Sequence, residues 1–151
     1  MHKIVIQNEP FDVAAIQDEL MANNSSVGAL VTFVGLMRDM NEGDQVSTMF
    51  LEHYPGMTEK ALQSIVDAAG ERWDLMGIQI VHRVGELRPM DAIVLVAVIS
   101  AHRGEAFRAC EFVIDYLKTR APFWKKERTQ DGDRWVSARH SDSDAEGRWS
   151  R

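Results

Sequence analysis

Hydrophobic and polar residues alternate along this chain with two different periods, and the period changes several times between its ends. Segments that are apolar at every second position, or β-branched throughout, predict strands: Lys3–Gln7, Ala29–Gly35, Val46–His53, Ile78–Val84, Ala92–Ser100, Phe123–Arg128 and Arg134–Arg139. Segments that are apolar at every third or fourth position predict helices: Asp12–Ala22, Thr58–Trp73 and Gly104–Arg120. This order of elements favours an α+β fold, in which helices pack on a largely antiparallel β-sheet.

The C-terminal part of the chain predicts a β-hairpin followed by a tail. Asp131 and Gly132 lie between the last two predicted strands, and an Asp-Gly pair favours a tight hairpin turn. The residues after His140 are polar, which predicts a flexible tail over residues 141–151. We expect residues 1–140 to form a single catalytic domain, since the chain shows no repeat or linker and 151 residues suit one domain.

The composition narrows the class of protein. Hydrophobic residues make up 45% of the chain and charged residues 26%, a globular balance, and the formal net charge of -6 argues against a general nucleic-acid binder. The longest apolar run, Ala92–Ile99, is far shorter than the roughly 20 residues that span a bilayer, and no signal peptide is visible. We therefore expect a cytoplasmic protein without a membrane segment.

Cysteine and histidine usage makes a metal site unexpected. Cys110 is the only cysteine, so neither a disulfide within the chain nor a zinc site built on several cysteines can form. It lies on the apolar part of a predicted helix, which indicates a core position rather than a nucleophile. The five histidines show no ligand spacing.

Basic residues nevertheless gather around one Ala-Pro turn, in the stretch YLKTRAPFWKKE at 116–127. Pro122 ends the preceding helix, because the residue before a proline avoids helical geometry. Beyond it side chains alternate, so Lys125 and Lys126 face opposite ways. If the chain folds back at this turn, Lys118 and Lys125 approach each other, and repulsion and burial would lower the pKa of each. One lysine could then act as a nucleophile or general base, whereas the alternative is a solvated basic patch.

Two further places could bind an anion. His102 and Arg103 lie where an apolar strand ends and a helix begins, and a helix N-terminus offers free N–H groups and a positive dipole end. A polar pair capping a loop fits these residues equally well. Arg38 lies in a polar loop bounded by Gly35 and Gly43, which could close over a phosphate, although a solvated arginine is the ordinary alternative.

Several long strings of the sequence resemble the large, catalytic subunit of molybdopterin synthase. They are LEHYPGMTEKAL (51–62), SAHRGEAF (100–107), DYLKTRAPFWKKE (115–127) and GDRWV (132–136). The loop VTFVGLMRDMNEG (31–43) fits the G-x-x-R-x-x-N-x-G pattern of the same family. The resemblance runs in register over residues 28–139.

The resemblance implies an enzyme of molybdenum cofactor biosynthesis. This family converts cyclic pyranopterin monophosphate (precursor Z) to molybdopterin by inserting two dithiolene sulfurs. The sulfur arrives as a thiocarboxylate on the C-terminal Gly-Gly of a small ubiquitin-like partner subunit, so no cofactor is expected on this chain. The large subunits form a homodimer with a small subunit at each end, which makes a heterotetramer.

The resemblance also implies roles for individual residues. The catalytic lysines of the family fall on Lys118 and Lys125. The substrate-binding positions fall on these two lysines and on Leu36, Met37, Arg38, His102, Arg103, Lys126 and Glu127. Leu36 and Met37 stand where the family often has a basic residue, which leaves the charge contribution of that loop open.

Two other classes of protein remain compatible with these residues. A non-catalytic module that docks a ubiquitin-like partner would bind this partner without forming product. A single-strand nucleic-acid binder would stack bases on Phe123 and Trp124 and would bind in a salt-dependent way. The net charge of -6 counts against the second alternative.

Overall fold

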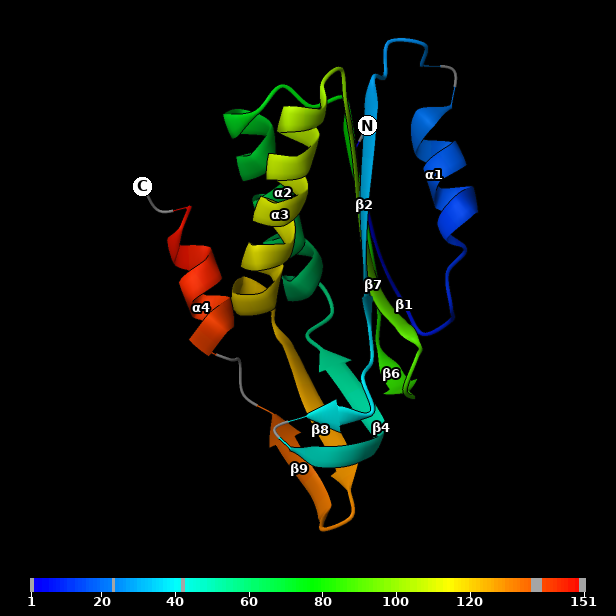
Figure 1. Ribbon diagram of the computed structural model, residues 1–151, viewed down its shortest axis with the longest axis vertical. Helices are drawn as coiled ribbons and strands as arrows, with labels where there is room; N and C mark the ends of the chain where they lie inside the picture. Colours follow the sequence, from blue (N-terminus) through cyan, green and yellow to red (C-terminus); the bar gives the residue numbers. More distant parts are fainter. Residues whose placement is uncertain (1, 23, 42, 137–139, 150–151) are drawn as a thin grey trace.

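The computed structural model describes residues 2–22, 24–41, 43–136 and 140–149, and it has two β-sheets, one above the other in Figure 1. The first sheet has the strand order β1–β5–β7–β2. Its strands are β1 (His2–Gln7), β5 (Gly77–Arg83), β7 (Ala92–Ser100) and β2 (Ala29–Leu36). β1 and β5 are parallel, and the other two pairs are antiparallel.

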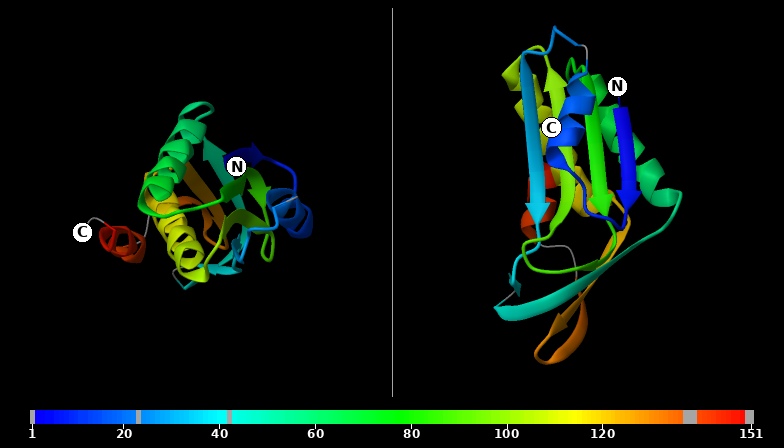
Figure 2. Two further views of the ribbon diagram at one scale, coloured as in Figure 1. Left: turned by 90° about the horizontal axis from the view of Figure 1, so that it is seen from above. Right: turned by 90° about the vertical axis from the view of Figure 1, so that its right-hand side faces the viewer.

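Helices cover both faces of this first sheet. α2 (Met57–Arg72) and α3 (Arg103–Arg120) lie on one face and α1 (Val13–Met21) lies on the other (Figure 1; Figure 2). Because strand side chains alternate, β7 supplies both cores. Val94, Val96 and Val98 pack on the α2–α3 side, and Leu95, Ala97 and Ile99 pack on the α1 side. Burial on both faces explains why this strand reads as a continuous apolar run.

The second sheet lies at the far end of the molecule, below the first in Figure 1. Its strands follow the order β3 (Met40–Asn41), β4 (Asp44–His53), β8 (Phe123–Thr129) and β9 (Gly132–Val136), and β6 (Gly85–Leu87) also pairs with β4. All of these pairs are antiparallel. The predicted α+β class and the C-terminal hairpin β8–β9 are therefore confirmed. Gly132 has φ of 110°, a backbone conformation that favours glycine in this turn.

The two sheets have connected but distinct cores. The second core consists of Met37, Val46, Met49, Leu51, Leu87 and Ile93. The ring of Phe123 packs against this core and also against the α2–α3 core of the first sheet. Phe123 therefore lies at the junction of the two layers.

The C-terminal residues, which the sequence predicts as a polar tail, contain regular secondary structure. The structure has a helix there, α4 (His140–Gly147), which packs against α3 (Figure 1). The ring of Trp149 meets Trp73 edge to face at a centroid distance of 5.6 Å, and its Nε1 donates to the Asp115 carboxylate at 2.8 Å. Arg148 donates to the same carboxylate at 2.9 Å. These long-range contacts give a polar segment a reason to be helical that its own pattern does not show.

Other predicted bounds shift by a few residues. Residues 137–139, the end of the last predicted strand, lie outside the described residues. In the part of the chain that the structure describes, no helix is both long enough and apolar enough to cross a membrane.

Candidate active site

The connection from α3 to β8 brings two layers of the fold together at the Ala-Pro turn. α3 ends at Arg120, and the backbone of the C-cap residue Ala121 is extended (φ -76°, ψ 134°), because Pro122 follows. The Phe123 N–H donates to the Ala121 carbonyl at 2.8 Å, which closes a tight turn. Lys118 lies in the last turn of α3, where a cation is favoured by the helix dipole, and Lys125 lies in β8 just beyond the turn.

Lys118 and Lys125 both act on one buried imidazole, that of His82 at the end of β5. Burial is the largest effect lowering the pKa of His82, to about 3, and the hydrogen bond to the Arg83 carbonyl opposes it. The charges of Lys118 and Lys125 lower this pKa further. Phe123 stacks on this ring, so the last turn of α3, which carries Lys118, and the start of β8, which carries Lys125, meet beside His82. The turn thus brings the two predicted lysines to one place.

Aromatic rings pack beside His82, where the two lysine-bearing segments meet. The ring of Phe123 stacks on His82 with a centroid distance of 3.8 Å and an interplanar angle of 15°. His53, opposite Phe123 in the β4–β8 register, has its ring centroid 6.2 Å from that of Phe123. The His53 Nδ1 lies 3.9 Å from a Glu59 carboxylate oxygen. His53, at the end of β4, therefore borders the lysine neighbourhood.

Sequence reasoning did not single out His82, although a signal was available. Ile78, Ile80 and His82 occupy alternate positions of β5, and both isoleucines belong to the α2–α3 core. A histidine at the next core-facing position of an apolar strand is a buried titratable group. Such groups often mark functional sites.

Glu127 lies on the same side of β8 as Lys125, but its carboxylate accepts hydrogen bonds from other side chains of this chain. It is 6% exposed, and the Asn41 Nδ2 donates to both of its oxygens at 3.0 Å. Arg134 from β9 also donates to Glu127, at 3.2 Å through Nη2, and to Asp44. This network ties β8 and β9 to the β3–β4 turn.

The loop that carries Arg38 is anchored on both sides. Met37, a predicted substrate-binding residue, has its side chain in the second core, with 6% exposure. Its N–H donates to the Asp91 carbonyl and its carbonyl accepts from Met90, both at 2.9 Å. Arg38 itself is exposed, and so is Leu36 just before it. The backbone therefore presents Arg38 to solvent from a fixed position.

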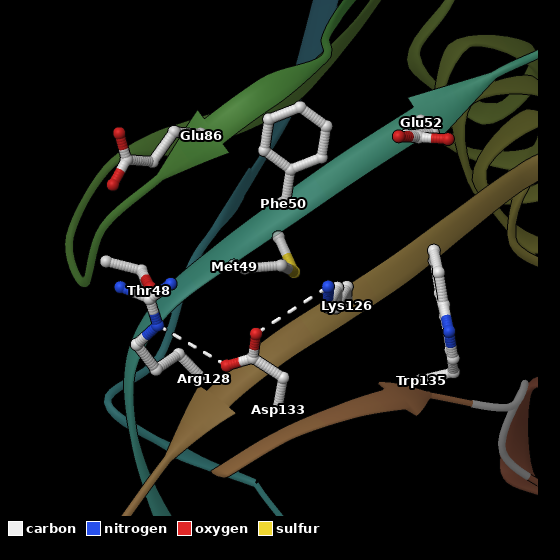
Figure 3. A pocket seen from close by; sticks show the side chains of 9 residues that line it. All are labelled: Thr48, Met49, Phe50, Glu52, Glu86, Lys126, Arg128, Asp133 and Trp135. Carbon is white, nitrogen blue, oxygen red and sulfur yellow. Dashed lines mark hydrogen bonds and ion pairs between the residues drawn. The ribbon is translucent and has the colours of Figure 1, made fainter.

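Lys126 lies on the opposite face of β8, as side-chain alternation predicts. It lines a pocket of about 440 Å³ on the outer face of the second sheet. Figure 3 shows it there together with Phe50 and Trp135. Its Nζ lies 3.6 Å from an Asp133 oxygen and 6.0 Å from the Trp135 ring centroid. The sheet itself separates Lys126 from Lys118 and Lys125.

His102 and Arg103 are also apart from the lysine pair. Both are exposed at the N-terminal end of α3. Lys118 follows Arg103 by 15 positions (118 − 103) on the same helix, which corresponds to about 22 Å at 1.5 Å per residue. A single chain therefore assembles the lysines with the aromatic rings beside them, but it does not bring His102 and Arg103 to them.

The chemistry of this site is that of amines beside a shielded apolar surface. Two lysines that share one neighbourhood can bind an anion, exchange protons with a substrate or act as amine nucleophiles. Among the residues that the structure describes, no group of three or more His, Cys, Asp or Glu side chains is placed to hold a metal ion.

Comparison with known proteins agrees with the resemblance. A model described as "MoaE protein" matches residues 6–120. A molybdopterin synthase catalytic subunit from Ralstonia nicotianae is 58% identical over 149 residues, which cover 99% of this chain and 85% of that protein.

Solved structures have the same fold. A molybdopterin biosynthesis MoaE protein from Burkholderia ambifaria is 55% identical, with a TM-score of 0.86, and the match covers 100% of this chain and 99% of that one. A chain from the complex of subunits 1 and 2 of the molybdopterin-converting factor of Helicobacter pylori has a TM-score of 0.72 at 20% identity, covering 91% of both chains. On the family match and the extent of identity, this chain belongs to the MoaE protein family, whose curated relatives are molybdopterin synthase catalytic subunits.

Proposed function

We propose that this member of the family transfers sulfur to cyclic pyranopterin monophosphate and so makes the dithiolene of molybdopterin. The sulfur comes from the C-terminal thiocarboxylate of a small ubiquitin-like partner subunit. The observation that carries the proposal is the convergence of Lys118 and Lys125 beside His82, at a turn whose sequence resembles the catalytic stretch of the family. An anionic substrate accounts for local basicity in a chain of net charge -6.

Cys110 supports an external source of sulfur. Its side chain is 4% exposed, and its thiol donates to the Val96 carbonyl at 3.6 Å. Burial raises the pKa of the Cys110 thiol to about 11. A thiol in this state is a poor nucleophile at neutral pH, because the thiolate is the reactive form. The partner's thiocarboxylate would supply what this thiol does not.

Lys118 is the residue to which we assign chemistry. As an amine it can give or take a proton at the pterin, or attack the thiocarboxylate carbon or a substrate carbon. Lys125 assists from β8, and the exposed Arg38 supplies a charge for the substrate phosphate. We assign no substrate contact to the side chain of Met37, because it is packed in the second core.

A homodimer resolves the separation between the lysine pair and the far end of α3. The resemblance implies a central pair of large subunits, and His102 and Arg103 lie about 22 Å along α3 from Lys118. In this proposal, these two residues serve the site of the second copy, where they hold the phosphate beside that copy's lysines. We also propose that one small subunit docks at each end of this homodimer. The location that we propose for the protein is cytoplasmic. A complex of two subunits is also the assembly named for the Helicobacter pylori protein.

The test is single-turnover molybdopterin formation from the thiocarboxylated partner and the pterin monophosphate. If Lys118 exchanges a proton or acts as an amine nucleophile, Lys118→Arg should lose nearly as much rate as Lys118→Ala, because guanidinium stays protonated. The expected loss is about 10²–10⁴-fold, the usual contribution of general acid–base catalysis. Lys125→Arg should retain part of the rate that Lys125→Ala loses.

Each variant is checked for folding and for affinity toward the partner subunit, which all four substitutions should leave intact. Near-normal turnover by Lys118→Arg would show that Lys118 supplies only charge. Partner binding without any product from the unmodified chain would favour the non-catalytic docking module instead.

A further inference from the structure

His82 is a buried polar side chain in direct contact with the candidate site, and no step of the proposed reaction uses it. It is 5% exposed and lies on the core-facing side of β5, next in line after Ile78 and Ile80. An apolar residue there would pack without the cost of burying an imidazole. The residue type at this position therefore calls for an explanation.

The hydrogen bond of His82 fixes which ring nitrogen carries the proton. Its Nδ1 lies 2.8 Å from the Arg83 carbonyl oxygen. A carbonyl only accepts, so Nδ1 is the donor. Burial, together with the charges of Lys118 and Lys125, lowers the pKa of His82 to about 3, so the ring is neutral at physiological pH. A neutral imidazole that donates from Nδ1 has its acceptor lone pair on Nε2.

The surroundings of the ring are aromatic on one side and cationic nearby. The ring of Phe123 stacks on one face of the His82 ring, with a distance of 3.8 Å between the ring centroids. The groups whose charges reach the ring come from three elements: Lys118 from α3, Lys125 from β8 and the titratable His53 from β4. Of the two lysines, Lys118 has the larger effect.

The neighbouring Arg83 is engaged elsewhere. Its Nε donates to the Asn8 carbonyl at 3.0 Å, and its Nη1 lies 3.8 Å from an Asp91 carboxylate oxygen. Phe123, which stacks on His82, follows the last turn of α3 across the tight turn at Ala121, so Lys118 and the imidazole lie at the same junction.

We propose that His82 is a positioning residue for the lysine pair, with its Nε2 lone pair accepting a hydrogen bond from the Lys118 ammonium group. The inference rests on the proposed function for its purpose. Two lysines of like charge repel, and an acceptor beside one of them keeps that one protonated and fixes its direction. Lys118 is then held as a proton donor toward the substrate, and its orientation is set by a ring that is itself held by Arg83 and Phe123.

Two substitutions separate this role from a purely structural one. His82→Phe keeps an aromatic ring to stack on Phe123 but removes the acceptor. His82→Gln loses the ring but places a side-chain carbonyl close to the position of Nε2. A structural role predicts that Phe is the better replacement, whereas a positioning role predicts that Gln is the better one for the state of Lys118.

The experiment is an NMR titration of the chain labelled with ¹³C at the lysine Cε, without substrate or partner. The Lys118 titration midpoint should fall by about one pH unit in His82→Phe, because a hydrogen bond to a charged group is worth that much or more. In His82→Gln it should fall by less than half of that. The exposed Lys60 of α2 should titrate identically in all three proteins.

A second measurement uses the unmodified chain, so it does not depend on the folding of a variant. Long-range ¹H–¹⁵N correlation at pH 7 should show His82 neutral and protonated on Nδ1 alone. An Nε2-protonated ring, or the same Lys118 midpoint in the unmodified chain and His82→Phe, would overturn the proposal. Neither measurement requires turnover, so a failure of molybdopterin formation is recognised separately. In the assembled enzyme, His82→Phe should lower kcat at least tenfold with little change in KM, and His82→Gln should recover most of it.

Discussion

Acid should destabilise this fold through His82, in a window that its shifted pKa defines. The pKa of His82 is about 3 in the folded chain, against an ordinary value of 6.5. Between these two values the unfolded chain binds the proton and the folded chain does not. The contribution of neutral His82 to stability is therefore complete above pH 6.5 and is lost as the pH falls toward 3.

The size of the effect follows from the width of the window. Each unit of difference in pKa corresponds to about 1.4 kcal/mol. Between pH 7 and pH 5 the unfolded state gains about 2 kcal/mol from protonating this one side chain. Such a loss is a sizeable fraction of the roughly 5–15 kcal/mol that stabilises a typical domain.

The assay is urea unfolding at pH 7, 6 and 5, at one protein concentration, for the unmodified chain, His82→Phe and His2→Gln. His2 is exposed, so its variant serves as the control. Carboxylates titrate in all three proteins, and the comparison removes their share. The free energy of unfolding should fall about 2 kcal/mol less in His82→Phe than in the other two between pH 7 and pH 5. Parallel pH dependence in all three proteins would refute the reasoning.

Three further substitutions test other parts of the structure. Arg38→Ala should weaken pterin binding in calorimetry by about tenfold, as expected for an exposed charge-assisted contact of about 1.5 kcal/mol, and leave the urea midpoint unchanged; unaltered affinity would remove Arg38 from the site. Cys110→Ser should keep single-turnover molybdopterin formation at near the normal rate, and a folded variant without activity would contradict an external sulfur source. Trp149→Ala should lower the free energy of unfolding by about 2–3 kcal/mol, because the ring packs on Trp73, and an unchanged value would mean that α4 adds little to stability.

Sequence periodicity predicted the main elements because burial acts locally on them. The strand Ala92–Ser100 was recognisable since both of its faces are covered, and the helix over 104–120 because it is apolar over most of its circumference. The short strands β3 and β6 were not predicted. They have two and three residues and exist through pairing with β4, which is distant from β6 in sequence. A pattern confined to neighbouring residues carries no information about such pairing.

The candidate site was predictable to the same extent. Alternation beyond Pro122 correctly separated Lys125 from Lys126, because it depends only on strand geometry. Substrate binding by Glu127 and Met37 stays a prediction, and the sequence did not show that Glu127 bonds to Asn41 and Arg134 or that Met37 packs in a core. The bond from Asn41 to Glu127 and the packing of Met37 with Leu87 and Ile93 link segments far apart in sequence.

The lysine neighbourhood is controlled by the junction between the two sheets. Lys118 belongs to a helix that packs on the first sheet, whereas Lys125 is part of the second sheet, so any movement between these layers changes their separation. The stack of His82 on Phe123 joins a strand of the first sheet to a strand of the second. Because each ring is also fixed within its own layer, by the Arg83 carbonyl and by the second core, the stack opposes sliding of one sheet past the other. The two amines therefore keep a defined spacing even though each comes from a different layer of the fold, and the proposed reaction requires such a spacing before substrate arrives.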